Sequence, residues 1–471
     1  MTTLRLTNKT IKYATDKYTR LVLTEEENVS FFVEKGKRRE LRVGVGKWKD
    51  ITPRKFITLV RGAIQAAKQN RVEYLALELD ASVFPKLEYG AEWFASTIAE
   101  NLLLSAYEFN RYKTAKEKKG KLKEILVCGL HDKQAWQRGL TLATCANLAR
   151  DIANTPGDDL TPSGLAKAAK EMAKGTKINV KVLDEKGIKK EGLHALWAVG
   201  KGADDMPRFI IMEYWGKGKP RTSDVPGEGR PIVLVGKGVT YDTGGLNIKP
   251  APAGGMHEMH MDMSGGASVI AAIVCAAKLG IKKNIVSLIP AAENAVSEKS
   301  MRAGDIIKSH LGKTIEVLHT DAEGRLILAD GLSYAQKYNP RAVLDVATLT
   351  GASLVALGTH ASAVMTKDES LQKTLVELGE ESGDYVWPLP LWEEYTVPLT
   401  QTRADVANIQ PGFVRNAGTI EGAAFLSFFA PKCPWAHIDI APRMDSVPND
   451  KLAKGSTGEP VRLLVKFLER Y

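Results

Sequence analysis

The sequence predicts an α/β protein with two domains: a small N-terminal α/β domain, and a larger C-terminal domain whose central mixed sheet is flanked by helices. The chain has 471 residues, more than one hydrophobic core ordinarily supports. Its 44% hydrophobic and 25% charged residues are ordinary for a globular protein. Short apolar runs alternate with helical patterns along most of the chain, as expected where helices pack on sheets.

The N-terminal domain is expected to cover residues 1–133. Its apolar runs at Glu73–Leu79 and Glu124–Leu130 are typical of strands, and the patterns at Phe56–Gln69 and Ala91–Tyr107 are typical of helices. This part has no paired histidines, no Gly-rich phosphate loop after a strand and no convergent acids. We therefore predict no chemistry in it.

The segment Met1–Leu23 contains basic residues, but it also contains Asp16 and lacks a central apolar block, so it is not a secretory signal. A mitochondrial transit segment stays open, although a first strand at Tyr18–Leu23 is favoured. No apolar run approaches the ~20 residues of a membrane span, so we expect no membrane association. The four cysteines are scattered without metal-ligand spacing, which fits a reducing compartment and a cytoplasmic protein. They are Cys128, Cys145, Cys275 and Cys433.

The net charge of +10 is unevenly distributed. Residues 1–160 carry 28 Lys and Arg against 20 Asp and Glu, a balance of +8, which leaves +2 for residues 161–471. Basic clusters lie at Lys35–Arg42 and Lys113–Lys123. One interpretation is a patch for DNA or another anionic surface. A solvated basic surface is favoured over it.

Residues 134–160 are expected to connect the domains. Gln134–Ala153 has a long helical pattern that ends at the breaker cluster Asn154–Gly157. The C-terminal domain, residues 161–471, then begins with a helix that runs to about Ala173. The Gly- and Pro-rich stretch Gly216–Arg230 is expected to be a surface loop.

The C-terminal domain alternates predicted strands and helices, which indicates a sheet covered on both faces. The strands are Ile178–Leu183, Arg208–Trp215, Pro231–Gly236, Asn284–Ile289, Ile315–Leu318, Ala342–Ala347 and His437–Ile440. The helices are Gly265–Lys278, Ile327–Tyr338 and Glu421–Ala430.

The stretch Thr320–Arg325 carries the strongest chemical signal. Asp321, Glu323 and Arg325 occupy alternate positions after an apolar run, so an extended backbone would direct all three side chains to one face. Two converging carboxylates repel each other unless a cation lies between them, and a divalent metal would supply it. Gly324 permits a turn or a close approach that a Cβ would block. A solvated loop with an incidental ion pair is the alternative.

A second candidate segment follows the strand Pro231–Gly236. Its four glycines fit neither the Walker spacing nor the dinucleotide fingerprint, so we reject a nucleotide loop. Instead, we favour a functional loop that brings Lys237, Asp242 and Lys249 close to a ligand. A plain surface arrangement of two lysines around one acid is the alternative. Asp262 opens the next predicted helix, where it could also serve as a cap. The nearby histidines, His257 and His260, have the wrong spacing for a zinc helix and are not expected to be ligands.

Three blocks of sequence now point to a known family. They are Val235–Gly245 with Lys249-Pro250, Asp262–Ala267, and Thr320–Leu326. Supporting pieces are Pro290–Asn294, Ala347–Ala352 and Trp435–Ala441. Over about residues 140–471 the chain resembles the leucine aminopeptidase (cytosol aminopeptidase) family of dinuclear metallopeptidases. The N-terminal domain is similar only in size and class.

The resemblance implies two divalent metal ions, Zn²⁺ or Mn²⁺ and otherwise Co²⁺ or Mg²⁺. It implies one site made by Lys237, Asp242, Asp262 and Glu323, and a second site that shares Asp242 and Glu323 with Asp321. Lys237 would bind as a neutral amine. The implied catalytic residues are Lys249, which would stabilise the oxyanion, and Arg325, which would hold a bicarbonate ion as general base.

The resemblance also implies a set of substrate-binding residues whose apolar character favours an amino-terminal Leu or Met. They are Met259, His319, Thr348, Leu349, Gly351, Ala441 and Met444. For Met259 and Met444, simple core filling is the alternative. His319 departs from the family, which usually has Asn there, and imidazole is bulkier and can titrate. Peptide substrates and a homohexamer are implied as well.

Two other functions stay open at this level. DNA binding is admissible because the first domain is basic and some relatives bind DNA, but it is not favoured. A related metallohydrolase could act on a non-peptide amide or on a special dipeptide. A substrate panel separates this possibility from a general aminopeptidase.

Overall fold

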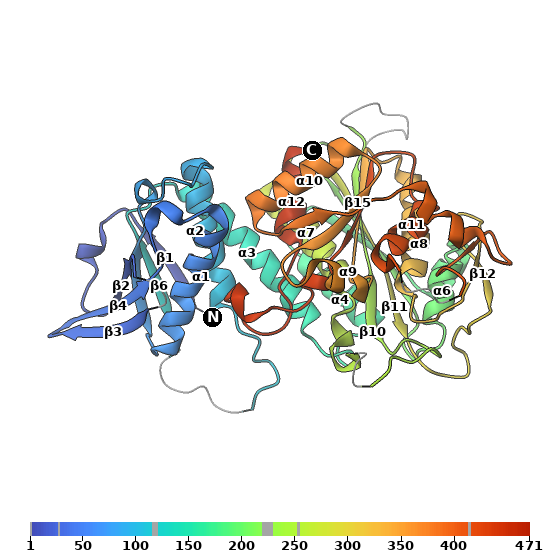
Figure 1. The fold of residues 1–471 in the computed structure, drawn as a ribbon, viewed down its shortest axis with the longest axis horizontal. Helices are drawn as coiled ribbons and strands as arrows, with labels where there is room; N and C mark the ends of the chain where they lie inside the picture. The colour runs from blue at the N-terminus through green and yellow to red at the C-terminus, as the bar shows by residue number, and fades with distance from the viewer. Residues whose placement is uncertain (1, 27–28, 115–120, 219–228, 252–254, 413–415) are drawn as a thin grey trace. The chain divides into compact units, whose positions relative to one another are not determined.

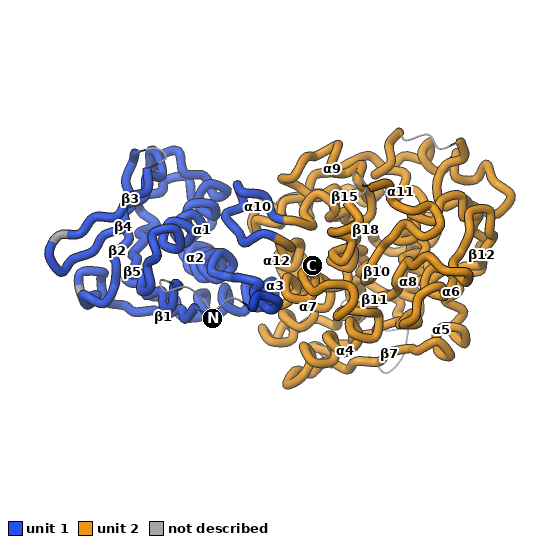
Figure 2. Tube along the Cα trace, turned by 90° about the horizontal axis from the view of Figure 1, so that it is seen from below, with its two compact units in different colours: residues 1–147, 446–454 blue, residues 148–445, 455–471 orange. Residues whose placement is uncertain are grey.

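The structure, a computed structural model, describes residues 2–26, 29–114, 121–218, 229–251, 255–412 and 416–471. It divides into two compact units (Figure 2). Unit 1 comprises residues 1–147 and 446–454, and unit 2 comprises residues 148–445 and 455–471. The division falls within helix α3 (Lys133–Ala153). A short segment near the C-terminus therefore belongs to the same unit as the N-terminus.

Unit 1 is built on a six-stranded sheet in the order β1-β6-β5-β2-β4-β3. All neighbouring strands are parallel except the edge pair β3–β4. The strands are β1 (Thr3–Thr7), β2 (Thr19–Thr24), β3 (Ser30–Lys35), β4 (Arg38–Gly44), β5 (Tyr74–Glu78) and β6 (Glu124–Cys128). The predicted strand at Tyr18–Leu23 is thus confirmed as β2, whereas β1 is an additional strand before it.

Two long helices, α1 (Pro53–Gln69) and α2 (Gly90–Ala106), pack together in unit 1. Helix α1 begins three residues before the predicted start at Phe56, because the Thr52 side chain accepts the Lys55 N–H and Pro53 occupies the first turn. The core of the unit joins Phe56 and Ile64 of α1 to Leu75 and Ile125 of the sheet. The basic cluster Lys35–Arg42 lies on the β3–β4 hairpin, and residues 115–120 of the other cluster lie outside the described residues.

Unit 2 contains the predicted mixed sheet, with the strand order β16-β15-β18-β14-β9-β11-β8-β7 and with β10 paired to β11. The central strands β18, β14, β9 and β11 are parallel. Strand β15 is antiparallel to β18 and parallel to β16, and β8 is antiparallel to both β11 and β7. The strands are β7 (Ile178–Leu183), β8 (Arg208–Trp215), β9 (Ile232–Gly236), β10 (Gly238–Asp242), β11 (Asn284–Asn294), β14 (Ala342–Ala347), β15 (Ser362–Thr366), β16 (Val386–Pro388) and β18 (Trp435–Asp439).

Helices cover both faces of this sheet (Figure 1). Helices α7, α10 and α12 pack together on one side, and α6, α8 and α11 form the other layer. Their bounds are α6 (His194–Gly200), α7 (Ser264–Leu279), α8 (Gly324–Ala335), α10 (Glu369–Ser382), α11 (Gly418–Ser427) and α12 (Val461–Arg470). The remaining helices of the unit are α4 (Pro162–Ala173), α5 (Glu185–Glu191) and α9 (Gly351–Leu357).

One helical stretch among the described residues, Met256–Leu279, is long and apolar enough to cross a membrane. It consists of the 3₁₀ turn η5 (Met256–Met261) and the helix α7. Of its most apolar window, 83% is buried inside the protein. Its apolar residues are thus accounted for by the core of unit 2.

One predicted strand has a different place from the one expected. Residues 315–318 do not join the central sheet, because β13 (Thr314–Glu316) pairs instead with β12 (Ile306–Lys308) and β17 (Val406–Ala407) in a separate three-stranded sheet. The chain leaves β13 at Glu316, whose carboxylate is held by Thr402 and Arg403. The loop before Asp321 therefore starts outside the central sheet.

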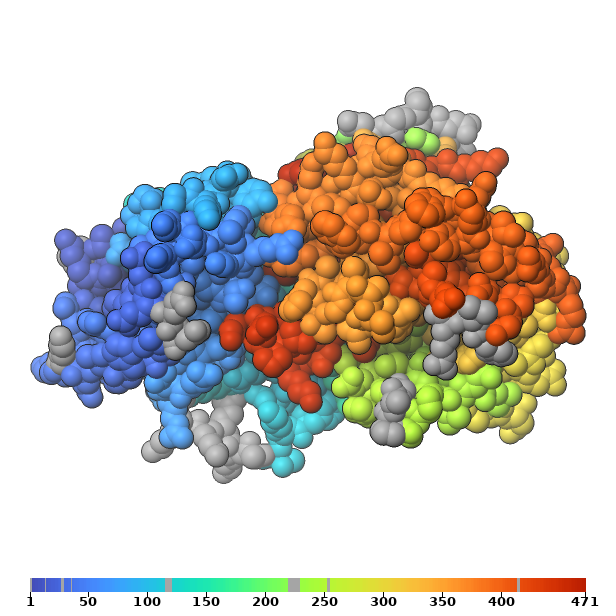
Figure 3. Space-filling view, in the orientation of Figure 1, coloured from blue at the N-terminus to red at the C-terminus, as the bar shows by residue number. Residues whose placement is uncertain are grey.

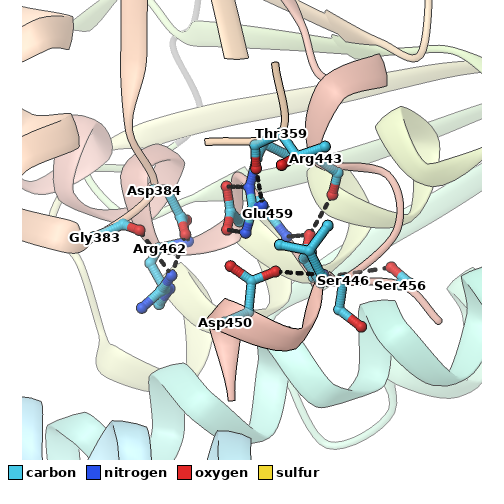
Figure 4. Close-up of polar contacts among 12 residues, drawn as sticks. Thr359, Gly383, Asp384, Arg443, Ser446, Asp450, Ser456, Glu459 and Arg462 are labelled. Atoms are coloured by element: carbon cyan, nitrogen blue, oxygen red, sulfur yellow. Dashed lines mark hydrogen bonds and ion pairs between the residues drawn. The ribbon is translucent and has the colours of Figure 1, made fainter. Parts of the chain in front are cut away.

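Two buried ion pairs fix the C-terminal segment within unit 2 (Figure 4). Arg443 Nη2 lies 2.7 Å from Glu459 Oε1, and Arg443 Nε donates to Glu459 Oε2. Arg462, in the first turn of α12, pairs with Asp384, whose Oδ2 also accepts the Arg462 backbone N–H at 2.9 Å. Each charge is satisfied by a partner of opposite sign, as buried charges require.

Candidate metal centre

Four carboxylates and two lysines converge beyond the carboxyl ends of β9 and β10. Lys237 follows β9 directly, and Asp242 ends β10. Asp262 lies between η5 and α7, and Glu323 immediately precedes α8. This is where ligands collect in parallel α/β sheets. All of these side chains are buried except Asp321 and Lys249, which reach the surface in part.

The two lysines divide the carboxylates between them. Lys237 Nζ lies 2.8 Å from Asp262 Oδ2 and 2.9 Å from Glu323 Oε1. Lys249 Nζ lies 2.8 Å from Asp242 Oδ2 and 2.6 Å from Asp321 Oδ1. The surrounding acids raise the pKa of both lysines against the opposing effect of burial. The two ammonium groups thus balance much of the acidic charge.

The expectation of an extended backbone from Asp321 to Arg325 is wrong. Asp321 lies in a turn, Glu323 has helical dihedral angles, and Arg325 belongs to the first turn of α8. The carboxylates meet because of the turn and the helix start, rather than by strand alternation. The expected role of Gly324 is confirmed, because a Cβ there would lie 2.5 Å from Lys237 Cε.

The carboxylate oxygens fit a divalent metal better than they fit the lysines alone. Asp262 Oδ2, Asp321 Oδ1 and Glu323 Oε1 are buried and have no hydrogen-bond partner among the described residues. These oxygens lie 2.8 Å (Asp262), 2.6 Å (Asp321) and 2.9 Å (Glu323) from a lysine nitrogen, so the lysines balance their charge as ion pairs. Oxygens of Asp242, Asp321 and Glu323 all lie within 4.8 Å of one another. Such an oxygen-rich set suits hard or borderline cations.

Burial and mutual repulsion have the expected electrostatic effect on these acids. Burial is the larger cause and raises the pKa of Asp262, Asp321 and Glu323, and the neighbouring Asp242 raises it further. A bound cation would reverse this effect by favouring the ionised carboxylates. Additional positive charge would therefore stabilise the ionised carboxylates of the cluster.

Asp262 does not act as the cap of α7. The helix starts at Ser264 without a side-chain cap, and the Asp262 carboxylate accepts hydrogen bonds from Lys237 Nζ and Thr348 Oγ1 at 2.9 Å and 2.7 Å. Thr348 also accepts a hydrogen bond from Lys237 at its backbone oxygen. The predicted substrate residue Thr348 is thus attached directly to the acidic cluster.

Arg325 lies beside the cluster, and one nitrogen of its guanidinium group lacks a hydrogen-bond partner among the described residues. Its Nη1 donates to the Asn408 backbone oxygen at 2.6 Å and to Glu421 Oε1 at 3.0 Å. Its buried Nε has no hydrogen-bond partner among the described residues. Such a donor in a buried position can hold an anion.

The other predicted substrate residues fall into two groups. Leu349, Gly351 and Ala441 come together because α9, which starts at Gly351, packs against the turn η9 (Ala441–Arg443), and Met444 directly follows that turn. Met259 and His319 instead flank the acidic residues. The Met259 backbone oxygen accepts from the Asp262 N–H, and His319 Nδ1 accepts from the Asp321 N–H at 3.2 Å.

Sequence reasoning assigned no role to four residues that orient this site. Asp439 is fully buried and accepts from the N–H groups of Leu349, Thr350 and Ala441 and from the Thr350 hydroxyl. Asn294 donates to Asp242 Oδ1 at 2.8 Å. Asn408 and Glu421 hold Arg325. Asp439 and Asn294 lie in supporting pieces of the resemblance, whereas nothing local marks Asn408 or Glu421.

Comparison with known proteins decides the family. Residues 147–465 match the catalytic domain of the cytosol aminopeptidase family, and residues 28–116 match its N-terminal domain. The chain belongs to the cytosol aminopeptidase family. Membership places the chain among the peptidases, which are hydrolases, and it agrees with the α/β architecture of both units.

Relatives of this family are similar over nearly the whole chain. A probable cytosol aminopeptidase of Nitrosospira multiformis is 40% identical over 91% of this chain and 82% of its own length. One of Syntrophotalea carbinolica is 41% identical over 87% and 82%. The solved structure of the bottromycin maturation enzyme BotP in complex with Mn superposes with a TM-score of 0.84 at 31% identity, covering 96% of this chain and 98% of that one.

Proposed function

We propose that this chain is a dinuclear metal-dependent aminopeptidase that releases amino-terminal residues, preferably Leu or similar apolar residues, from peptides. The observation that carries the proposal is the buried acidic cluster, in which three carboxylate oxygens lack a hydrogen-bond partner among the described residues. Its position at the carboxyl ends of the central strands supports the proposal, as does membership of an aminopeptidase family.

The residues that would hold two divalent ions are Lys237, Asp242, Asp262, Asp321 and Glu323. Asp242 and Glu323 would serve both ions, with Asp321 completing one site and Lys237 and Asp262 the other. Lys237 would lose its proton to act as a ligand. When bound, the ions would lower the pKa of a bridging water towards ~7 and polarise the scissile carbonyl. Zn²⁺ and Mn²⁺ are the favoured ions, with Co²⁺ and Mg²⁺ as further members of the class.

Lys249 and Arg325 would act on the reacting groups. The Lys249 side chain is 13% exposed, against 4% for Lys237, so it can reach a substrate while remaining charged. It would donate to the oxyanion of the tetrahedral intermediate. Arg325 would hold a bicarbonate ion as general base, and its partnerless Nε supports an anion at that position. Glu421 and Asn408 would keep the guanidinium in place.

The substrate's first side chain would lie against Thr348, Leu349, Gly351, Ala441 and Met444, with Met259 at the opposite wall. The shared anchor Asp439 supports this arrangement, because it holds the Leu349 and Ala441 backbones together. His319 would face the substrate beside Asp321, where the family usually has Asn. We also propose a cytoplasmic homohexamer, by family likeness.

A narrower substrate range is a second candidate. It is favoured by the similarity to BotP, which is named for the maturation of bottromycin. In this alternative the same chemistry would remove the first residue of one modified peptide. A general aminopeptidase hydrolyses many amino-terminal residues, so a panel of peptides with varied first residues distinguishes the two.

The proposal is tested with chelator-stripped protein to which Mn²⁺, Zn²⁺ or Co²⁺ is added back. Hydrolysis of Leu-amide should return with the metal, and N-acetyl-Leu-amide should remain intact because it lacks a free amine. In Lys249→Ala, kcat should fall by about 10²–10³ with metal binding retained, as for loss of one oxyanion donor. Full metal occupancy without turnover of any free amino-terminal residue would contradict the proposal.

A further inference from the structure

Unit 1 contains a groove of about 750 Å³ that has no part in the chemistry described above. It runs along α1, between this helix, the β3–β4 strand pair and the segment 446–454. All of its lining residues belong to unit 1. The volume lies within the range of ligand sites.

The far wall of the groove is fixed by hydrogen bonds. The Lys451 backbone oxygen accepts from Gln65 Nε2 at 3.2 Å and from Ser105 Oγ at 2.8 Å. The neighbouring Asp450 oxygen accepts from Arg61 Nη1 at 3.3 Å. The segment 446–454, coloured red in Figure 3, thus lies against the blue surface of helices α1 and α2. This wall is built from residues more than 300 positions away in the sequence.

Gly62 lines the groove at a position where the fold of unit 1 does not require glycine. Gly62 is an interior residue of α1, where Gly costs about 1 kcal/mol relative to Ala. A Cβ at this position would meet no atom within 4 Å, and its φ is not positive. Neither packing nor backbone conformation therefore requires glycine. Its effect is to leave the floor of the groove open.

The groove is apolar inside and basic at its rim. Val43, Ile51 and Leu59 contribute to the floor, and Lys55 and Lys451 lie at the rim, exposed. No acidic side chain occurs among the described lining residues. Neither lysine has an ion-pair partner in the part of the chain that the structure describes. Residues 1–160, which carry most of this surface, have a charge balance of +8.

We propose that this groove binds a short acidic segment of a partner protein, with apolar side chains between its carboxylates. From Arg54 to Gln69 the lining face of α1 extends about 22 Å at 1.5 Å per residue, which matches about seven residues of extended peptide. The apolar side chains fill the floor above Gly62, and the carboxylates meet Lys55 and Lys451. Duplex DNA fits less well, because its charged phosphates make no favourable contact with apolar side chains.

The probe is a fluorescent pool of N-acetylated octapeptides with Glu at alternate positions and Leu, Val or Phe between them. Acetylation removes the free amine that the proposed active site requires, so binding at that site does not contribute. Fluorescence anisotropy is measured with the full-length protein at low and moderate salt. A matched pool with Lys in place of Glu serves as the charge control and should not bind.

Variants at Gly62 supply the steric test. Gly62→Leu should keep or raise the thermal midpoint, since it improves helix propensity and enters open space, while binding weakens at least tenfold. Gly62→Ala is the matched control and should stay within about threefold. The double variant Lys55→Glu/Lys451→Glu should also weaken binding at least tenfold and reduce its dependence on salt. Leu-amide hydrolysis should be unchanged in all of them, which separates this test from that of the proposed function.

Three results would overturn the proposal. They are no binding of the Glu pool, equal binding by Gly62→Leu and wild type, and preferential binding of duplex DNA that the Lys55→Glu/Lys451→Glu variant abolishes. The last result would assign the basic rim to nucleic acid instead.

Discussion

The acidic cluster around Asp242 and Asp321 and the ion-pair cluster around Arg443 and Glu459 are both buried in unit 2, and both combine carboxylates with cations. In the ion-pair cluster, every carboxylate has hydrogen bonds from an arginine or a backbone N–H. In the acidic cluster, three carboxylate oxygens have none within the described residues. The carboxylates of the ion-pair cluster are thus all hydrogen-bonded, and this cluster is complete as a structural element. The acidic cluster, which is buried except for the partly exposed Asp321 and Lys249, needs a further partner.

The largest expected effect of this difference is on activity. Asp321→Asn removes one proposed ligand without changing its shape, so metal-dependent hydrolysis should fall to background. The metal-free protein should unfold at the same or a higher temperature, because one of the mutually repelling acids is gone. Activity assays and thermal unfolding of the metal-free variant check both parts. A metal-free Asp321→Asn that unfolds several degrees lower would make this cluster a structural one.

The second prediction concerns the ion-pair cluster. Asp384→Ala leaves Arg462 buried without its carboxylate, which should destabilise unit 2 by about 3–5 kcal/mol. Urea unfolding of the metal-free proteins measures this loss. Arg462→Met with Asp384→Leu is the control, because replacing both charges should restore much of the stability. Asp384→Ala with wild-type stability would show that the contrast between the clusters has no energetic basis.

An intermediate effect is expected at Asp439, whose hydrogen bonds hold the loop next to the acidic cluster. Asp439→Ala removes three hydrogen bonds from the loop that carries Thr348 and Leu349, and a fourth from the Ala441 N–H. Because Thr348 contacts both Lys237 and Asp262, metal affinity should drop by roughly 10–100-fold, and KM should rise more than kcat falls. Asp439→Asn keeps one acceptor oxygen and should lie between the two. A loss of stability with unchanged KM and metal affinity would contradict this positioning role.

The smallest effect is expected at Glu316, a carboxylate paired with an exposed arginine. Hydrogen bonds from Thr402 and Arg403 lower the pKa of Glu316 from 4.5 to about 2. Since the folded-state pKa is depressed, the stabilisation is present above pH ~4.5 and is lost as the pH falls through 2. Glu316→Gln should cost about 1 kcal/mol at pH 7, because Arg403 is exposed and solvent screens the pair. Urea unfolding at pH 7 and pH 3 should show the difference shrinking with acid.

Those parts of the fold that depend on local pattern could be predicted from sequence. Strands β7, β8 and β14 have the predicted bounds, and β9 differs from its prediction by one residue. The apolar runs of β8, β9 and β14 are buried, and β7 alternates half-buried apolar with exposed polar side chains. The strand β4 could not be found in this way, since only Leu41 in it is fully buried and its other side chains are polar or half-exposed. The segment 446–454 also has no local signal, because its place in unit 1 is set by distant contacts with α1.

In the site, too, local sequence patterns could be predicted and contacts between distant residues could not. Lys237, Asp242 and Asp321 lie near buried strands or glycines that mark them in the sequence, and the structure joins them through Glu323 and Lys249. Strand alternation is the wrong reason for the convergence of Asp321 and Glu323, because the chain turns into α8 there. Asn408 and Glu421 reach Arg325 from 83 and 96 positions away, and no short-range spacing predicts such contacts.

The most direct test of the acidic cluster is the number of metal ions that each chain binds. Chelator-stripped protein is titrated with Mn²⁺ in a calorimeter, and the bound metal is then measured by mass spectrometry after dialysis. Two ions per chain are predicted for the wild type, and at most one for Asp321→Asn. Glu316→Gln, which alters a complete pair, should still bind two. Wild-type protein that binds no Mn²⁺, Zn²⁺ or Co²⁺ would contradict the account, because the lysines alone would then have to satisfy the acids.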